Sequence, residues 1–376
     1  MNVKSKTISC RCRHCNKVST KYHDNKVVYP LVGTLNDKAI IMKVQKKRFK
    51  CFNCDKTFVE PTYDIRFKAQ ISNTIRENLF NHIVTGQTYT SSSKLNNISI
   101  NSAVNIFDKY RIKSTRYTKV RNILIDELRL LSNKKKFQFV IIDADTREML
   151  DILETRNQKD VYNYLLDKFE VGDLETVTMD LWNPYRRAVY KFNQVTGKNI
   201  IVIADKFHFI RQIMWDLDSI RIEEFEKFSV NSKEYKTIKH CSKLLRIRRD
   251  KLSTKGLLRL EEAFKLSKRL YIAYQFKESY LDLVKTCTSK EKFIEEIDQW
   301  LQILANANLK GFKRTISSHN NWKDEISNAF AYKYSNGYIE GANQKMKLAK
   351  NKAFGFRNLQ RTEKLMQLQI GKRRVI

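Results

Sequence analysis

The stretch 122-NILIDELRL-130 begins a series of short apolar segments that decides the fold. Two more such segments follow closely, 137-FQFVIIDAD-145 and 148-EMLDILET-155, and polar residues bound each of them. Short runs rich in Ile, Val and Phe between polar turns are typical of β-strands. The sequence therefore predicts three successive strands between residues 122 and 155.

Beyond these strands the pattern changes to alternating helices and strands. Helical spacing at 157–169 precedes a strand pattern, 175-ETVTMDLW-182. A second helical pattern at 184–192, with Pro184 suited to a first helical turn, precedes the strand 199-NIIVIADKF-207. The order β-β-β-α-β-α-β is that of the ribonuclease-H-like fold, an α/β architecture with a mixed sheet and helices on both faces.

Carboxylates occupy informative places in these strands. Asp126 lies inside the first strand, where burying an acid is costly unless it is paired or bound to metal. Asp180 closes the fourth strand, at the carboxyl edge where α/β sites open, and the two acids would be close if these strands are neighbours. A third carboxylate is then expected from a helix across that edge, which Glu340 could provide, while Asp143 is a rival on the adjacent strand. For any one acid alone, a solvated strand or helix end is the plain alternative.

Such a set of acids suits phosphodiester chemistry. Cleavage by two divalent ions needs carboxylates that hold the metals roughly 3.5–4 Å apart, so that one activates the attacking oxygen and the other stabilises the leaving oxygen. Hard oxygen ligands select magnesium or manganese. Mg²⁺ or Mn²⁺ is therefore the cofactor expected at these carboxylates.

The charge of the chain indicates a polyanionic partner. Lys and Arg number 72 and Asp and Glu number 40 in 376 residues, which gives a net charge of +32 and favours nucleic acid, with an anionic membrane surface as the competitor. No apolar run approaches the roughly 20 residues that span a bilayer, and the first residues lack the apolar core of a secretory signal. We expect a cytoplasmic, nucleoid-associated protein.

Two CxxC pairs near the N-terminus predict a metal site. Cys12 and Cys15 form one pair, Cys51 and Cys54 the other, and four thiolates arranged in this way suit tetrahedral Zn²⁺. The intervening segment has the character of a β-hairpin, so residues 1–62 are interpreted as a zinc knuckle. Reduced cysteines in a small core are the alternative, and Cys10 and His14 are spare candidates for one ligand.

The next segment, residues 63–118, has the outline of a helix-turn-helix. An amphipathic helix at 65–86 precedes 89-YTSSSKLNNISINSAVNIFDKYRIK-113, in which a polar turn separates a short helix from a second one. The second helix would offer these side chains to a DNA groove: Asn101, Ser102, Asn105 and Lys109. Small all-α subdomains show the same pattern without binding DNA, and the overall charge and the adjacent cysteine module favour the DNA-binding interpretation.

The remaining part of the chain is helical in pattern. We assign residues 119–210 to the first part of the catalytic core, 211–330 to an all-helical insertion, and 331–376 to the closing helical segment of the core. The insertion accounts for the 160 residues (340 − 180) between Asp180 and Glu340. Trp300 within it could stack on an unpaired base, although a helical Trp is more often part of a core.

Glu340 lies between Gly337 and Gly341 at the beginning of a lysine-rich helix. Asn343 follows Glu340 by three residues and Lys347 follows Asn343 by four, so all three share one helix face, which would combine a metal ligand with groups that bind DNA phosphates. The two glycines would allow DNA backbone or another helix to approach closely.

Taken together, these motifs resemble the bacterial ISL3-type insertion-sequence transposases of the DDE superfamily. The resemblance rests on Asp126 with its neighbours, 180-DLWNPYR-186, 202-VIADKFHFIRQ-212 and 336-NGYIEGANQKMK-347. It covers almost the whole chain, because that family also begins with a zinc knuckle and a helix-turn-helix. Several motifs in the same order make the resemblance specific.

The resemblance implies roles for individual residues. Asp126, Asp180 and Glu340 match the catalytic triad that holds the magnesium ions, and Asp205 and His208 match an auxiliary D-x-x-H element. The activity implied is binding of the terminal inverted repeats of an insertion sequence, followed by cleavage and strand transfer of double-stranded DNA. Such enzymes act as homodimers or larger assemblies, because two element ends must be joined.

Two other functions remain open on the sequence. One is a sequence-specific DNA-binding regulator with an inactive catalytic domain, which the presence of all three acids disfavours. The other is a ribonuclease-H-like structure-specific nuclease, which fits separate end-recognition modules less well. For His208, a satisfied histidine near the sheet edge is as plausible as a catalytic role.

Overall fold

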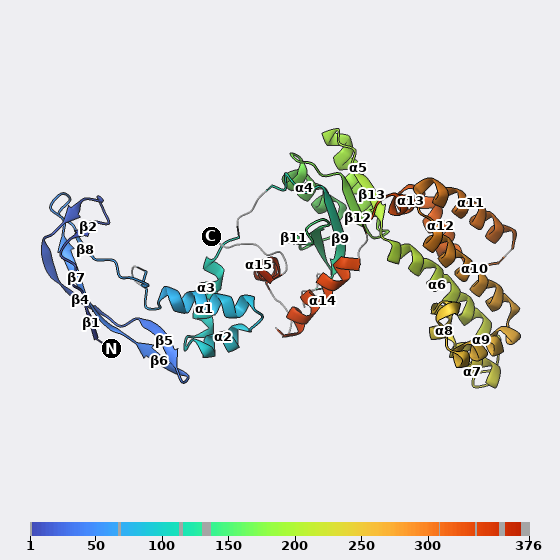
Figure 1. The fold of residues 1–376 in the computed structure, drawn as a ribbon, viewed down its shortest axis with the longest axis horizontal. Coiled ribbons are helices and arrows are strands. Elements are labelled where there is room, and N and C mark those ends of the chain that lie inside the picture. The colour runs from blue at the N-terminus through green and yellow to red at the C-terminus, as the bar shows by residue number, and fades with distance from the viewer. Residues whose placement is uncertain are drawn as a thin grey trace. The chain divides into compact units, whose positions relative to one another are not determined.

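The computed structural model describes residues 2–66, 69–112, 116–129, 137–307, 309–334, 337–352 and 358–369 (Figure 1). The chain forms two compact units. One unit comprises Met1–Lys113 together with Leu348–Ile376, and the other comprises Ser114–Lys347. No helix within the described residues combines the length and the apolar character that crossing a membrane requires.

The second unit contains a five-stranded mixed sheet (Figure 1). Its strands are β9 (Asn122–Leu128), β10 (Gln138–Asp143), β11 (Met149–Leu153), β12 (Thr176–Met179) and β13 (Ile201–Ala204). The spatial order is β11-β10-β9-β12-β13, with antiparallel pairs from β11 to β9 and parallel pairs from β9 to β13. The five predicted strands and the mixed α/β architecture are confirmed.

Helices α4 (Gln158–Phe169) and α5 (Asn183–Thr196) share one hydrophobic core with the sheet. Phe169 and Phe192 from these helices belong to the same buried cluster as Ile123 and Ile125 of β9. Because successive side chains of a strand point to opposite faces, the alternate β9 residues point away from this cluster. That alternation sets the direction of Asp126.

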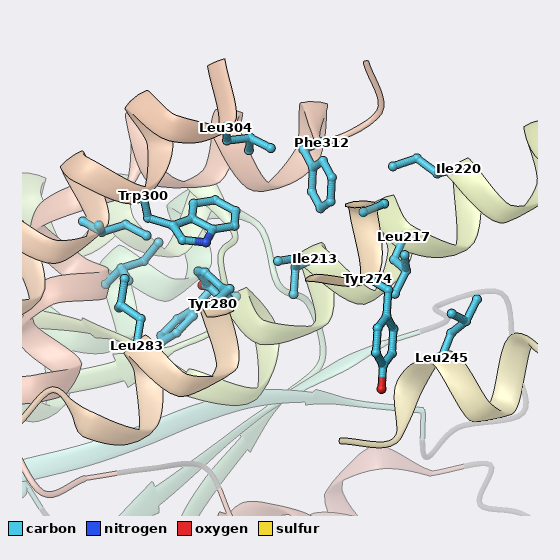
Figure 2. Close-up of a cluster of buried hydrophobic side chains, with 14 of the residues drawn as sticks. Ile213, Leu217, Ile220, Leu245, Tyr274, Tyr280, Leu283, Trp300, Leu304 and Phe312 are labelled. Atoms are coloured by element: carbon cyan, nitrogen blue, oxygen red, sulfur yellow. The ribbon is translucent and has the colours of Figure 1, made fainter. Parts of the chain in front are cut away.

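The segment after β13 consists of helices in its described part. These are α6 (Lys206–Phe225), α7 (Lys233–Lys239), α8 (Ser242–Arg246), α9 (Thr254–Leu266), α10 (Lys268–Thr286), α11 (Lys290–Asn306), α12 (Lys313–Asn321) and α13 (Lys323–Ala331), with a short 3₁₀ turn at Arg249–Lys251. Ile213, Leu217, Tyr280 and Phe312 belong to its core, which also includes Trp300 (Figure 2). The Trp300 ring is buried and its Nε1 donates to Ser279 Oγ at 2.9 Å, so the structure favours the core role over base stacking.

The N-terminal unit begins with β-structure. A four-stranded sheet contains β1 (Asn2–Lys4), β4 (Tyr22–Val28), β7 (Lys43–Lys50) and β8 (Thr57–Val59). The β-structure of this unit also includes two separate small hairpins, β2 (Cys10–Arg11) with β3 (Val18–Ser19), and β5 (Leu31–Leu35) with β6 (Lys38–Ile41). The strands on either side of the CxxC turns bring those turns together.

Three short helices follow, α1 (Asn73–Val84), α2 (Tyr89–Leu95) and α3 (Ile100–Lys109). Each begins at a residue whose side-chain oxygen accepts a hydrogen bond from a backbone N–H of the first turn, and these capping residues are Ser72, Thr88 and Ser99. The two remaining helices are α14 (Gly337–Lys352) and α15 (Leu359–Gln369).

The structure divides the C-terminal segment differently from the sequence analysis, which kept residues 331–376 together with the catalytic core. Leu348–Ile376 groups with the N-terminal unit. The physical reason is hydrophobic packing, because Leu365 and Leu368 of α15 contact the core formed by α1 and α3.

Candidate active site and metal centres

Three aspartates lie at one level across the parallel strands. Thr176 of β12 pairs with Asn122 of β9 and with Ile201 of β13. Four residues further along the chain from these positions stand Asp126, within β9, and Asp180 and Asp205, directly after β12 and β13. The register is continuous as far as Thr178 with Leu124 and Met179 with Ala204, so the three acids follow at the carboxyl edge of the sheet.

The three aspartates also share one face. Ile123, Ile125 and Val177 pack against α4 and α5, so the residues that alternate with them point to the opposite side. Helix α6 begins directly after Asp205 and α13 packs against β13 there. The three carboxylates therefore lie at the carboxyl edge of the sheet, on the face opposite α4 and α5.

His208, in the first turn of α6, joins two of these acids. Its Nδ1 lies 2.8 Å from Asp180 Oδ1 and 2.9 Å from Asp205 Oδ2. Burial of the ring, the largest single effect, lowers the pKa, but the hydrogen bonds and charges of the two aspartates outweigh it and raise the pKa to about 9. His208 is therefore a cation at neutral pH, held between two carboxylates.

One oxygen of this cluster has no well-aligned hydrogen bond within the described residues. It is Asp180 Oδ1, which is buried although it lies close to Nδ1 of His208. A single N–H cannot point at two carboxylates at once, and it is aligned with Asp205. The ligand atoms of Asp180, Asp205 and His208 all lie within 4.8 Å of one another, so they fit a divalent cation as well as a proton.

Asp126 lies beside this group without belonging to it. Its Oδ1 accepts a hydrogen bond from the backbone N–H of Glu127 at 2.6 Å. Glu340 lies in α14, but its side chain falls outside the described residues, as does that of Asn343, while Lys347 is exposed. The structure thus places Asp126, Asp180, Asp205 and His208 at the carboxyl edge of the sheet. The contribution of Glu340 is part of the proposed function below.

Asp143 does not take part in this site. It pairs with Ile123 at the opposite end of β9, because β10 is antiparallel to β9. Its Oδ1 accepts hydrogen bonds from the backbone N–H groups of Asp145 and Thr146, at 2.9 and 3.1 Å. The carboxylate closes a turn, so the rival suggested by the sequence is excluded by strand direction.

A second, partly exposed cluster next to the site escaped the sequence analysis. Glu127, which points to the face opposite Asp126, accepts a hydrogen bond from Tyr185 at 3.0 Å and pairs with Arg156. The Arg156 guanidinium stands 4.7 Å from the ring centroids of both Trp182 and Phe137. The only sign of this cluster in the sequence was Glu127, a second acidic residue inside an apolar strand. Its partners, Tyr185 and Arg156, come close to it only when the chain folds.

Four cysteines converge at the N-terminal turns. Cys12 Sγ lies 3.7 Å from Cys54 Sγ, and Cys15 Sγ lies 3.5 Å from Cys51 Sγ. Zn–S distances of about 2.3 Å imply sulfur–sulfur edges of about 3.8 Å in a tetrahedron, so the four thiols fit zinc. Cys10 and His14 are outside the group whose ligand atoms lie within 4.8 Å of one another.

The two CxxC turns have the same geometry. After the first pair Asn16 has φ 61°, and after the second pair Asp55 has φ 54°. In each turn this residue donates its backbone N–H to the carbonyl of the first cysteine, Cys12 or Cys51. Asn and Asp tolerate the left-handed region, which allows both thiols of each pair to face one point.

The predicted DNA-contacting residues of α3 are accessible. Asn101, Asn105 and Lys109 are exposed, and Ser102 is half-buried with its side chain next to the capping Ser99. The opposite side of α3 is apolar, with Ala103, Ile106 and Phe107 in the core. This distribution agrees with a surface helix that keeps one polar face free.

A comparison with protein families identifies the class of protein as a transposase. A family model for ISL3-type DDE transposases, described as "Transposase", matches residues 123–365. Because this range is more than half of the chain, the protein belongs to the ISL3 transposase family, which confirms the resemblance. The matched range contains Asp126, Asp180 and Glu340, whereas the four cysteines of the two CxxC pairs precede it. A search of curated proteins found no match.

Proposed function

We propose that this transposase binds the terminal inverted repeats of its insertion sequence and cuts and rejoins double-stranded DNA with divalent metal ions. The observation that carries the proposal is the alignment of Asp126 and Asp180 at one level of two parallel strands. Adjacent carboxylates at an open sheet edge are what two metal ions need for in-line displacement at a phosphodiester.

The catalytic core in this proposal is ribonuclease-H-like. The strand order β11-β10-β9-β12-β13, with three antiparallel strands leading into parallel ones, supports that assignment. Helices α4 and α5 on one face and α6 and α13 toward the other agree with it. The helical insertion then lies between β13 and the helix that carries Glu340.

Each residue has a definite part in the proposed reaction. Asp126, Asp180 and Glu340 would hold Mg²⁺ or Mn²⁺, which when bound polarises the phosphoryl oxygens and activates the attacking oxygen. His208 would orient the Asp180 carboxylate through their ion pair, in which Nδ1 lies 2.8 Å from Asp180 Oδ1, while its N–H is aligned with Asp205. Asn343 and Lys347, on the same helix face as Glu340, would contact the DNA backbone.

Recognition of the ends is assigned to the N-terminal unit. Helices α2 and α3 would act as a helix-turn-helix, with these residues in the groove: Asn101, Ser102, Asn105 and Lys109. Cys12, Cys15, Cys51 and Cys54 would hold Zn²⁺ and fix the adjoining β-structure. Joining two ends requires a homodimer or a larger assembly on DNA, and the place of action would be the bacterial nucleoid in the cytoplasm.

The test is cleavage of a labelled duplex that carries the element's terminal sequence, with Mg²⁺ present. Intact protein should cut at the end of the repeat, while Asp180→Asn and Glu340→Gln should bind the duplex equally well and not cut. Asp143→Asn is the matched control, since this acid lies at the other end of the sheet, and it should cut like the intact protein. Binding without cutting by the intact protein would favour a regulator, and equal cutting of branched DNA without end sequences would favour a structure-specific nuclease.

A further inference from the structure

The C-terminal helix α15 is built into the unit that contains α1, α2 and α3. Leu365 and Leu368 pack against the core of these helices, and Thr362, Met366 and Gln367 are buried. Lys364 Nζ contacts the carbonyl oxygen of Phe107, near the end of α3, and stands 4.3 Å from the centroid of the Phe107 ring. An amine at the carboxyl end of a helix is favourable because the last carbonyls there lack partners within the helix.

A bidentate ion pair extends this contact to the exposed side of α3. Arg361 Nε lies 2.9 Å from Asp108 Oδ1, and Arg361 Nη2 lies 2.7 Å from Asp108 Oδ2. The two residues are 253 positions apart in the sequence. The hydrogen bond to Asp108 raises the pKa of Arg361 above its usual value, so the guanidinium remains charged. Both side chains keep more than a third of their surface exposed.

Asp108 lies on the face of α3 that is proposed to read DNA. It follows Asn101 and Asn105 at spacings of seven and three residues, and all three are exposed, so they form one stripe of the helix. A carboxylate in this stripe would face the phosphates of a bound duplex and repel them. Arg361 is placed to cancel that charge, and its Nη1 makes no hydrogen bond with any residue in the described part of the chain.

We propose that α15 is part of the DNA-binding surface, with Arg361 as a positioning residue that neutralises Asp108 and presents its Nη1 to a phosphate of duplex DNA. The proposal rests on the proposed function, specifically on α3 as the DNA-reading helix. It means that the end-recognition unit is assembled from both termini of the chain. The same C-terminal segment follows α14, the helix that carries Glu340, with only six residues between Lys352 and Leu359.

The experiment measures binding of full-length protein to the end duplex and to a scrambled duplex of equal length, over a range of salt concentrations. Arg361→Ala should weaken end binding by about tenfold, the effect of losing one charged contact. It should also lower the slope of log affinity against log salt by about one. Arg361→Ala combined with Asp108→Asn should recover part of the lost affinity, because the uncovered carboxylate is gone while the phosphate contact of Arg361 stays lost.

This design separates charge from structure. Both variants lack the ion pair, so a pair that only fastens α15 would weaken binding equally in both, and that result would overturn the proposal. Undiminished end binding by Arg361→Ala would overturn it as well. Lys323→Ala removes one exposed cation from an ion pair with Asp298 on the helical insertion and should leave affinity unchanged. If the intact protein does not prefer the end duplex over the scrambled one, the proposed function itself fails, and this inference fails with it.

Discussion

Nδ1 of His208 lies 2.8 Å from Oδ1 of Asp180, which connects the first turn of α6 to the residue directly after β12. The same nitrogen donates to Asp205, so one imidazole holds the Asp205 carboxylate by a hydrogen bond and the Asp180 carboxylate by charge. An acid that is oriented before a metal arrives does not have to be ordered during the reaction. Asp205 and His208 therefore have a physical role beside the proposed triad, which is to hold the Asp180 carboxylate in place.

We expect His208→Ala to lower cleavage at limiting Mg²⁺ by about 10- to 100-fold, the usual effect of losing a partner that orients a metal ligand. High Mg²⁺ should restore part of the activity, and binding of the end duplex should not change, because the residue is remote in sequence from the DNA-reading helix. Cleavage rates at several Mg²⁺ concentrations provide the measurement. His240→Ala, an exposed histidine of the insertion, serves as the control. Equal rates at low Mg²⁺ would argue for the satisfied-histidine alternative.

The four-cysteine group leads to a prediction about zinc. Purified protein should contain about one Zn²⁺ per chain, and Cys51→Ser should contain much less, since a structural site uses all four ligands. Removing the metal with a chelator should lower the thermal stability of the N-terminal β-structure and the affinity for the end duplex. Cys10→Ser is the control, because Cys10 lies outside the group. Loss of zinc on changing Cys10, with retention on changing Cys51, would reassign the ligands.

His319 should make the stability of the helical insertion depend on pH. Burial lowers its pKa to about 4, and its Nε2 lies 2.9 Å from the hydroxyl of Tyr280. A histidine with a folded-state pKa below the unfolded value of about 6.5 stabilises the fold fully above that value and loses the contribution as pH falls toward 4. The free energy of unfolding should drop by about 2 kcal/mol from this residue between pH 7.5 and pH 4.5.

Denaturant unfolding at several pH values tests that expectation. His319→Gln should be less stable than the intact protein at pH 7.5, because the hydrogen bond with Tyr280 is altered, yet its stability should fall less between pH 7.5 and pH 4.5. His240→Gln, a change at an exposed position of the same insertion, should keep the full dependence on pH. An identical pH profile for His319→Gln and the intact protein would contradict the assigned cause.

Gly341 follows Glu340 in α14, and a Cβ atom added there would lie within 4 Å of no described atom other than those of its chain neighbours and of the backbone of its own helix. Gly341→Ala should therefore raise the free energy of unfolding by about 0.5–1 kcal/mol, because Gly is unfavourable inside a helix. If DNA backbone approaches this position, the added methyl group should nevertheless reduce cleavage. Thermal unfolding and cleavage are measured together, with Gln344→Ala as the exposed control. Full cleavage by the stabilised variant would contradict the idea that DNA backbone approaches Gly341.

Much of the sheet in the second unit could be predicted because the information that specifies it is local. The strands from β9 to β13 are short apolar runs between polar turns, so hydrophobic patterning alone located them. The CxxC spacing identified the four cysteines because each pair is one tight turn. Asp126 and Asp180 were recognisable since an acid within or directly after an apolar strand is unusual.

Tertiary structure decided what depends on contacts between distant segments. Strand direction excluded Asp143 and aligned Asp126 with Asp180, and burial showed that Trp300 belongs to a core. The place of α15 beside α3, and the pairing of Arg361 with Asp108, could not be predicted from the sequence. Periodicity shows which face of a helix is apolar, whereas the partner that covers this face is selected only when the whole chain packs.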